Sequence, residues 1–139
     1  MTPVAPGERP ADRGSVAVEV VLVAPLLIVL LVFIAGLGRI AHTRGQVDGA
    51  AADAARSASL QRTPAAAQHA GEAAARAYLG TACQQLDVLI DTARLRPGGE
   101  VQARVDCDTS LSGLGMAGLR GHKNFTATAV APIETYRGE

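Results

Sequence analysis

Few side chains in this sequence have the types and spacing that catalysis or cofactor binding requires. Residues 113–118 read G-x-G-x-x-G. A dinucleotide site also needs a helix and a second strand after that run, and Pro132 interrupts the short remainder of the chain. The three histidines, His42, His69 and His122, are scattered and lack the context of a catalytic nucleophile. We therefore expect no enzymatic activity and no cofactor.

The two cysteines, Cys83 and Cys107, are the remaining reactive side chains. No histidine or further cysteine stands at metal-ligand spacing from either of them, so we predict no metal site. Outside a membrane, two such cysteines favour a disulfide, and two free thiols are the alternative. Closing this loop of about 25 residues would stabilise the folded state by about 3.5 kcal/mol in the chain-entropy model.

The composition indicates a small protein with a weak core. Thirteen basic and thirteen acidic residues give a formal net charge of zero, which gives no reason to expect nucleic acid as a partner. The chain has no tryptophan, two phenylalanines and two tyrosines. A core of alanine, valine and leucine buries little area per residue, so a soluble domain of about 100 such residues would be marginally stable.

An uncharged apolar run covers residues 20–38, between Glu19 and Arg39. As a helix this run is about 28 Å long, close to the thickness of about 30 Å of the hydrocarbon layer of a bilayer. A buried core helix would show a polar stripe, which this run lacks. A cleaved secretory signal would be shorter and would end in a small-x-small site, which the following GRIAHTRG does not match. We therefore predict a transmembrane helix that stays in the protein.

Two residues of the apolar stretch are unusual in a membrane. Pro25 removes one helical hydrogen bond and crowds the carbonyl of Val21, so we expect a helix kink there, although membrane helices also tolerate proline. Glu19 places a carboxylate near the end of the stretch, where a charge costs less than the ~2.5–3.5 kcal/mol of the bilayer centre. Two interpretations of Glu19 stay open, because the carboxylate can reach interfacial water or pair with a positive group.

The run over residues 13–27, RGSVAVEVVLVAPLL, resembles the N-terminus of TadE-like proteins. These proteins are pseudopilins of tight-adherence (Flp) pilus systems and relatives of type IV pilins. By this resemblance Gly14 is the residue before a cleavage point, and Ser15 is the new N-terminus. Glu19 then matches the glutamate that the family carries at the fifth position after the cut.

The rest of the resemblance is looser. Residues 54–58 are similar to an Ala/Arg-rich helix of the family, and residues 125–131 are similar to its C-terminal strand. Pilins often carry phenylalanine or methionine where this chain has Ser15, and Flp pilins carry tyrosine where it has Val20. The difference at Val20 favours a minor pseudopilin or accessory component over the major pilus subunit.

The resemblance also implies a location, a processing step and partners. Residues 1–14 would form a cytoplasmic leader at the bacterial inner (cell) membrane, and the part after Arg39 would lie outside it. A prepilin peptidase would cut between Gly14 and Ser15, and the new ammonium group would pair with Glu19 of a neighbouring subunit. The expected partners are this peptidase, pilus platform membrane proteins, other pilins or pseudopilins, and the lipid bilayer.

The sequence predicts an α+β fold in which a transmembrane helix over residues 15–38 continues outward. Residues 39–80 form extracytoplasmic Ala-rich helices, and the second of these begins with Thr63 as its cap. Residues 81–139 form a small β-rich extracytoplasmic domain. We expect a small antiparallel sheet of about three strands, because three segments have strand patterns. These segments are residues 86–90, 100–107 and 125–133.

The sequence leaves two possible functions open. The first is a TadE-like pseudopilin or accessory component of a tight-adherence pilus or type IV-like secretion system, acting by membrane anchoring and subunit assembly. The second is a membrane-anchored envelope protein with an unrelated binding or secretion accessory role. Genes for a secretion ATPase and platform proteins beside this one would favour the first.

Overall fold

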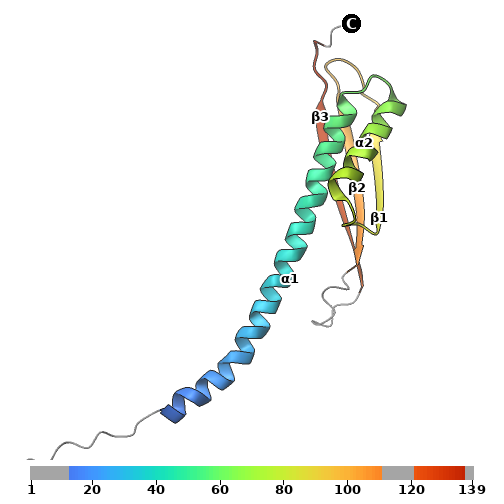
Figure 1. Ribbon diagram of the computed structural model, residues 1–139. Helices are drawn as coiled ribbons and strands as arrows, with labels where there is room; N and C mark the ends of the chain where they lie inside the picture. Colours follow the sequence, from blue (N-terminus) through green and yellow to red (C-terminus); the bar gives the residue numbers. More distant parts are fainter. Residues whose placement is uncertain (1–12, 111–120, 137–139) are drawn as a thin grey trace, which may run out of the picture. The chain divides into compact units, whose positions relative to one another are not determined.

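The computed structural model describes residues 13–110 and 121–136 (Figure 1). The elements along the chain are α1 (Arg13–Ser59), α2 (Pro64–Leu79), β1 (Gln85–Asp91), β2 (Glu100–Ser110) and β3 (His122–Pro132). The predicted α+β fold is confirmed: a long apolar helix and a second helix precede a three-stranded antiparallel sheet. The G-x-G-x-x-G run lies outside the described residues.

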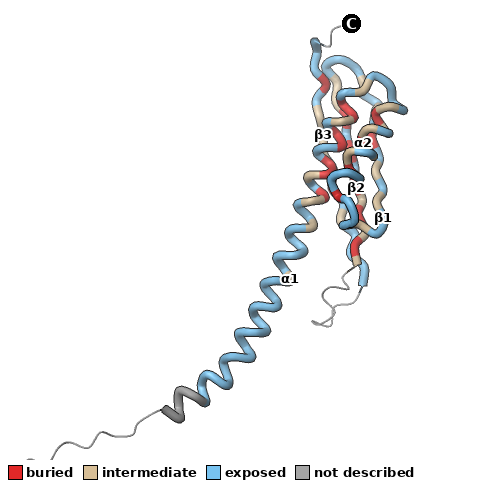
Figure 2. The backbone as a smooth tube through the Cα atoms, viewed as in Figure 1, coloured by how far each residue is buried: buried red, intermediate tan, exposed pale blue. Residues whose placement is uncertain are grey.

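The chain divides into two compact units, Met1–Leu37 and Gly38–Glu139, and α1 contributes residues to both. In the first unit, the large apolar side chains from Val18 onward are exposed, as the pale blue part of α1 in Figure 2 shows. The helical stretch Val18–Ser59 is long and apolar enough to cross a membrane, and it is therefore a candidate membrane span. Lipid accounts for this exposed apolar surface, whereas a soluble protein would bury it.

The second unit is built on a sheet with the strand order β1-β2-β3, in which both neighbouring pairs are antiparallel. In the register, Val88 of β1 lies opposite Val105 of β2, and Val105 lies opposite Ala127 of β3. Burial alternates along the central strand, as expected when one face of a sheet packs on a core. The buried residues of β2 are Val101, Ala103, Val105, Cys107 and Thr109.

Both helices of the second unit cover the same face of the sheet (Figure 1). The buried residues of α1 recur at intervals of three and four, and this spacing places them on one side of the helix. The apolar ones are Val47, Ala50, Ala51, Ala54, Ala55 and Ala58, and Ser59 at the end of the helix is buried as well. Small side chains let the elements approach closely, since a Cβ atom on Gly71 of α2 would lie 2.5 Å from Cδ1 of Ile90.

The ends of α2 carry the capping residues that the sequence predicts. The hydroxyl of Thr63 accepts a hydrogen bond of 3.2 Å from the backbone N–H of Ala66, and Pro64 follows in the first turn. Gly80 ends the helix with φ of 54°, and its N–H donates to the carbonyl of Arg76 at 2.9 Å. The left-handed value of φ explains why glycine occupies this position.

A glutamine of α2 closes the outer edge of β1. The side-chain amide of Gln68 donates to the carbonyl of Val88 at 2.9 Å, and its oxygen accepts from the N–H of Ile90 at 3.0 Å. These are two of the backbone groups that a further strand would bind at that edge. Gln68 therefore satisfies these two edge groups of β1 from the helical layer, which disfavours strand addition there.

Candidate functional site

The predicted processing and assembly residues all lie in the first turns of α1. Gly14 and Ser15 follow the first helical residue, Arg13, and the structure describes their backbone only. Glu19 stands four positions after Ser15 on the same helix, and its side chain is exposed. Positions four apart share one face of a helix, so Ser15 and Glu19 lie on the same side of α1.

Glu19 has no hydrogen bond or ion pair to any of the residues that the structure describes. Exposed apolar side chains surround it along α1, including Val18, Val20 and Val21. A carboxylate in such surroundings is stable at a membrane only if it reaches water or meets a positive group on another molecule. Among the described residues, nothing neutralises this acid near the end of the apolar helix.

Pro25 lies inside α1, and the helix continues through it. Proline cannot donate the hydrogen bond that the carbonyl of Val21 would otherwise accept. The uninterrupted helix fits the tolerance of membrane helices for proline, and the kink at Pro25 stays a prediction.

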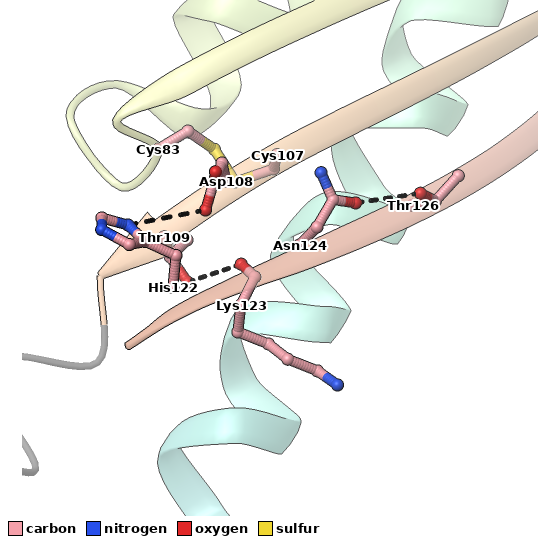
Figure 3. The surroundings of a disulfide bond; sticks show 8 residues. All are labelled: Cys83, Cys107, Asp108, Thr109, His122, Lys123, Asn124 and Thr126. Carbon is pink, nitrogen blue, oxygen red and sulfur yellow. Dashed lines mark hydrogen bonds and ion pairs between the residues drawn. A yellow bond between two sulfur atoms is a disulfide. The ribbon is translucent and has the colours of Figure 1, made fainter. Parts of the chain in front are cut away.

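The predicted disulfide between Cys83 and Cys107 is present in the structure, with 5.4 Å between the two Cα atoms (Figure 3). Cys107 is fully buried in the central strand, and Cys83 is partly buried just before β1. The bond ties the segment between α2 and β1 to β2, next to the backbone pairing of Leu86 with Cys107. A covalent link at this point compensates for the small side chains of the core.

Asp106, on the outer face of the sheet, has a pKa below its ordinary value. The hydroxyl of Thr126 donates a hydrogen bond to Asp106, and this bond lowers the pKa of the Asp106 carboxyl. Arg104 lowers it further through a contact of 3.1 Å between Nε and Oδ2, while partial burial of Asp106 acts in the opposite direction. The pKa of Asp106 is thus lowered although Asp87 lies directly opposite it on β1.

Sequence reasoning missed a hollow of about 730 Å³ on the second unit, which residues of α1, α2 and β3 line. Its apolar lining includes Leu60, Tyr78 and Val130, which are all more than half exposed. Asp53 and Arg56 of α1 also line it, and the structure shows no ion pair between these two described residues. Nothing in the spacing of these lining residues along the sequence brings them together, so no local pattern predicts the hollow.

These features define a class of protein, in which a candidate membrane-spanning helix is joined to a small disulfide-linked α+β unit. Residues 14–56 match the sequence model of the family described as TadE-like protein. This match covers the apolar helix and the first part of the second unit, and it confirms the resemblance to TadE-like proteins that the N-terminal residues predict. No curated protein and no solved structure matches the chain.

Proposed function

We propose that this chain is a pseudopilin or accessory component of a tight-adherence pilus that acts through subunit contacts and catalyses no reaction. The apolar part of α1 anchors it in the bacterial inner membrane, with its N-terminus in the cytoplasm and the second unit outside. The observation that carries this proposal is the family match over residues 14–56, which contains the exposed apolar helix and Glu19.

The proposed mechanism uses the N-terminal turns of α1. A prepilin peptidase cleaves the peptide bond between Gly14 and Ser15, and Gly14 suits this step because it places no side chain in the protease cleft. Cleavage leaves an ammonium group on Ser15. In an assembly, that group pairs with the Glu19 carboxylate of a neighbouring subunit, because an unpaired charge in lipid is costly.

Glu19→Ala tests the pairing step, with Val18→Ala as the matched control on the same helical turn. We expect Glu19→Ala to reduce the amount of pilus sheared from cells about tenfold, since a pairing contact near the lipid contributes on the order of 1–2 kcal/mol. Glu19→Asp should retain part of the function. Unchanged pilus formation in Glu19→Ala would contradict the pairing role.

Mass spectrometry of the membrane-extracted protein tests the processing step. We expect the mature chain to begin at Ser15 when an active prepilin peptidase is present, and to keep residues 1–14 when the peptidase gene is deleted. Gly14→Val should block cleavage, because a branched side chain obstructs the approach of the backbone. A chain that still begins at Met1 or Thr2 in the presence of the active peptidase would refute cleavage.

A further inference from the structure

The sheet of the second unit has two edge strands, β1 and β3, because its strand order is β1-β2-β3. Gln68 of α2 binds two backbone groups at the edge of β1, those of Val88 and Ile90. The edge of β3 extends over His122–Pro132. An edge strand whose backbone groups have no partner is a template for pairing with another chain.

The backbone groups that β3 presents at its edge follow from the register. The N–H of Ile133 donates to the carbonyl of Gly99 at 2.9 Å, one position beyond the last residue pair of β2 and β3. Alternate residues of an antiparallel strand bond to its neighbour, so the odd-numbered residues of β3 bond to β2 and the even-numbered residues direct their N–H and C=O groups away from it. Between the strand ends, the residues of this outward row are all exposed, and they are Asn124, Thr126, Thr128 and Val130. Within the described part of the chain, no hydrogen bond from a helix, a turn or a side chain reaches their backbone groups.

The side chains of the outward row leave this edge open to a further strand. They are uncharged, and threonine and valine are residues that favour strands and pair well across them. Natural edge strands are commonly protected by lysine, proline or a bulge. In β3, Lys123 and Pro132 stand at the two ends, and the register with β2 is continuous between them. Residues 124–131 therefore form an unprotected edge.

The hollow described above adjoins one end of this edge. Residues 130–132 of β3 line it together with residues of α1, among them Ala52 and Leu60. A further strand beside β3 would direct its side chains alternately to the outer face of the sheet and to the face that the helices cover. The hollow thus gives room for a side chain on the helix side of an added strand.

The lining of the hollow indicates which side chains would fit there. Its apolar part includes Leu60 and Tyr78, which are both more than half exposed. Its charged groups are the carboxylates of Asp53 and Glu134 and the guanidinium of Arg56, so the lining is net negative. An apolar side chain next to a lysine or arginine fits this lining, since burial of the first and attraction of the second are both favourable.

We propose that the free edge of β3 binds an extended segment of another protein, which adds a fourth strand to the sheet. The outward row offers N–H and carbonyl groups at the repeat of an extended chain, and another extended backbone matches that repeat. The segment is uncharged beside Asn124 and Thr126, and it carries an apolar and a basic residue beside Val130. This inference rests on the assembly role proposed above, because it states how a partner of that role binds.

A second copy of this chain does not fit the same edge when both copies are anchored in one membrane. Two identical β3 edges would pair antiparallel around a two-fold axis. Because β3 runs in the same direction as the second-unit part of α1 (Figure 1), this pairing would set those parts of the two α1 helices antiparallel. Copies anchored in one membrane leave it in the same direction. The edge of β1 offers no alternative, since Gln68 occupies it.

Photo-cross-linking in native host cells tests the contact. The cross-linking amino acid benzoylphenylalanine replaces Thr128 in one full-length chain and Val130 in another, and it replaces the exposed Leu89 of β1 in the control. We expect both β3 positions to capture the same protein, with a yield at least about fivefold above that of the control. Moving the probe from Thr128 to Val130 should move the captured partner residue by about two positions, because paired strands advance together.

A proline at an outward position tests the backbone contact. Thr128→Pro removes an N–H that faces away from β2, so the hydrogen bonds between β2 and β3 remain. With the probe at Val130, we expect Thr128→Pro to lower the yield about tenfold, whereas the matched control Thr128→Val keeps the N–H and should leave the yield unchanged. Formation of the disulfide between Cys83 and Cys107 is the check that the proline variant folds. If that variant does not fold, the two-position advance of the captured residue decides.

Several outcomes would overturn the proposal. One is a yield at Thr128 and Val130 that is no higher than at Leu89, and another is capture of a differently tagged copy of this chain. Capture of one and the same partner residue by both probes would exclude a paired strand. A captured segment with acidic residues beside Val130 would contradict the stated chemistry, and equal yields from folded Thr128→Pro and Thr128→Val would contradict the backbone contact.

The outcome for this contact is separable from the proposed function. Capture with the two-position advance, in cells whose pili form without this chain, would support the contact and refute the pilus role. A chain that pili require, but whose β3 edge captures nothing, would keep that role and refute the contact.

Discussion

At the scale of single residues, two chemical features stabilise the sheet of the second unit. The first is the Thr126–Asp106 hydrogen bond, which holds the pKa of Asp106 below its ordinary value. A carboxyl with a lowered folded-state pKa adds stability above its unfolded pKa, and this contribution disappears as the pH falls through the folded value. The second is the disulfide, which constrains the unfolded chain.

Replacing Thr126 with valine tests the role of the hydrogen bond at constant side-chain shape. We expect Thr126→Val to lower the melting temperature at pH 7 slightly and to have no additional effect below the acidic titration range of Asp106, where the carboxyl is protonated in both states. Thermal unfolding followed by circular dichroism from pH 7 down to pH 2 measures this difference. Thr128→Val, on the same exposed face of β3, is the control, and an equal loss in both variants at every pH would contradict the assignment.

Removing the disulfide should have a larger effect. With Cys83→Ala and Cys107→Ala combined, we expect a loss of about 2–4 kcal/mol in the free energy of unfolding, measured by denaturant titration in detergent. Treating the unaltered protein with a reductant should reproduce most of that loss, and reductant should not affect the double variant. A stability that does not respond to reduction would show that the bond contributes little.

At the scale of elements, Gln68 provides a contact that local patterns cannot reveal. We expect Gln68→Ala to destabilise the second unit by about 1–3 kcal/mol, because two backbone groups of β1 lose their partner. Hydrogen exchange measures the effect directly, since the N–H of Ile90 should exchange much faster in the variant. Gln102→Ala, on the exposed face of β2, serves as the control. Unchanged protection of Ile90 in Gln68→Ala would refute the role of the glutamine.

The elements themselves could largely be predicted, because their signals are local. The polar and apolar alternation in β2, the cap at Thr63 and the apolar run in α1 each depend on neighbouring residues, and each appears where the sequence indicates it. The hydrogen bonds of Gln68 join α2 to backbone groups of β1 about twenty residues away. The hollow of about 730 Å³ is lined by residues of three elements. Neither follows from periodicity, since both depend on how the layers pack.

At the scale of the whole molecule, the chain combines a candidate membrane-spanning helix with a unit that has its own core. Every buried apolar residue of the core lies between Val47 and Ile133, within the second unit. The helices shield only one face of the sheet, and the outer face carries charged and hydroxyl groups that are compatible with water. The two parts therefore suit different surroundings, and each part can be tested separately.

Residues 39–139 alone and the full chain should differ in whether they dissolve in water or stay with the membrane. We expect residues 39–139, exported to an oxidising compartment, to stay in the aqueous phase, form the disulfide and unfold in one cooperative transition. The full chain should remain in the membrane pellet after alkaline carbonate extraction and dissolve only with detergent, because its exposed apolar helix is stable in lipid. The matched control is the full chain with Leu26→Arg and Leu30→Arg, whose charges at the centre of the run should release it from the membrane. Recovery of the unaltered full chain in the aqueous phase, without detergent, would refute the membrane anchor on which the proposed assembly role depends.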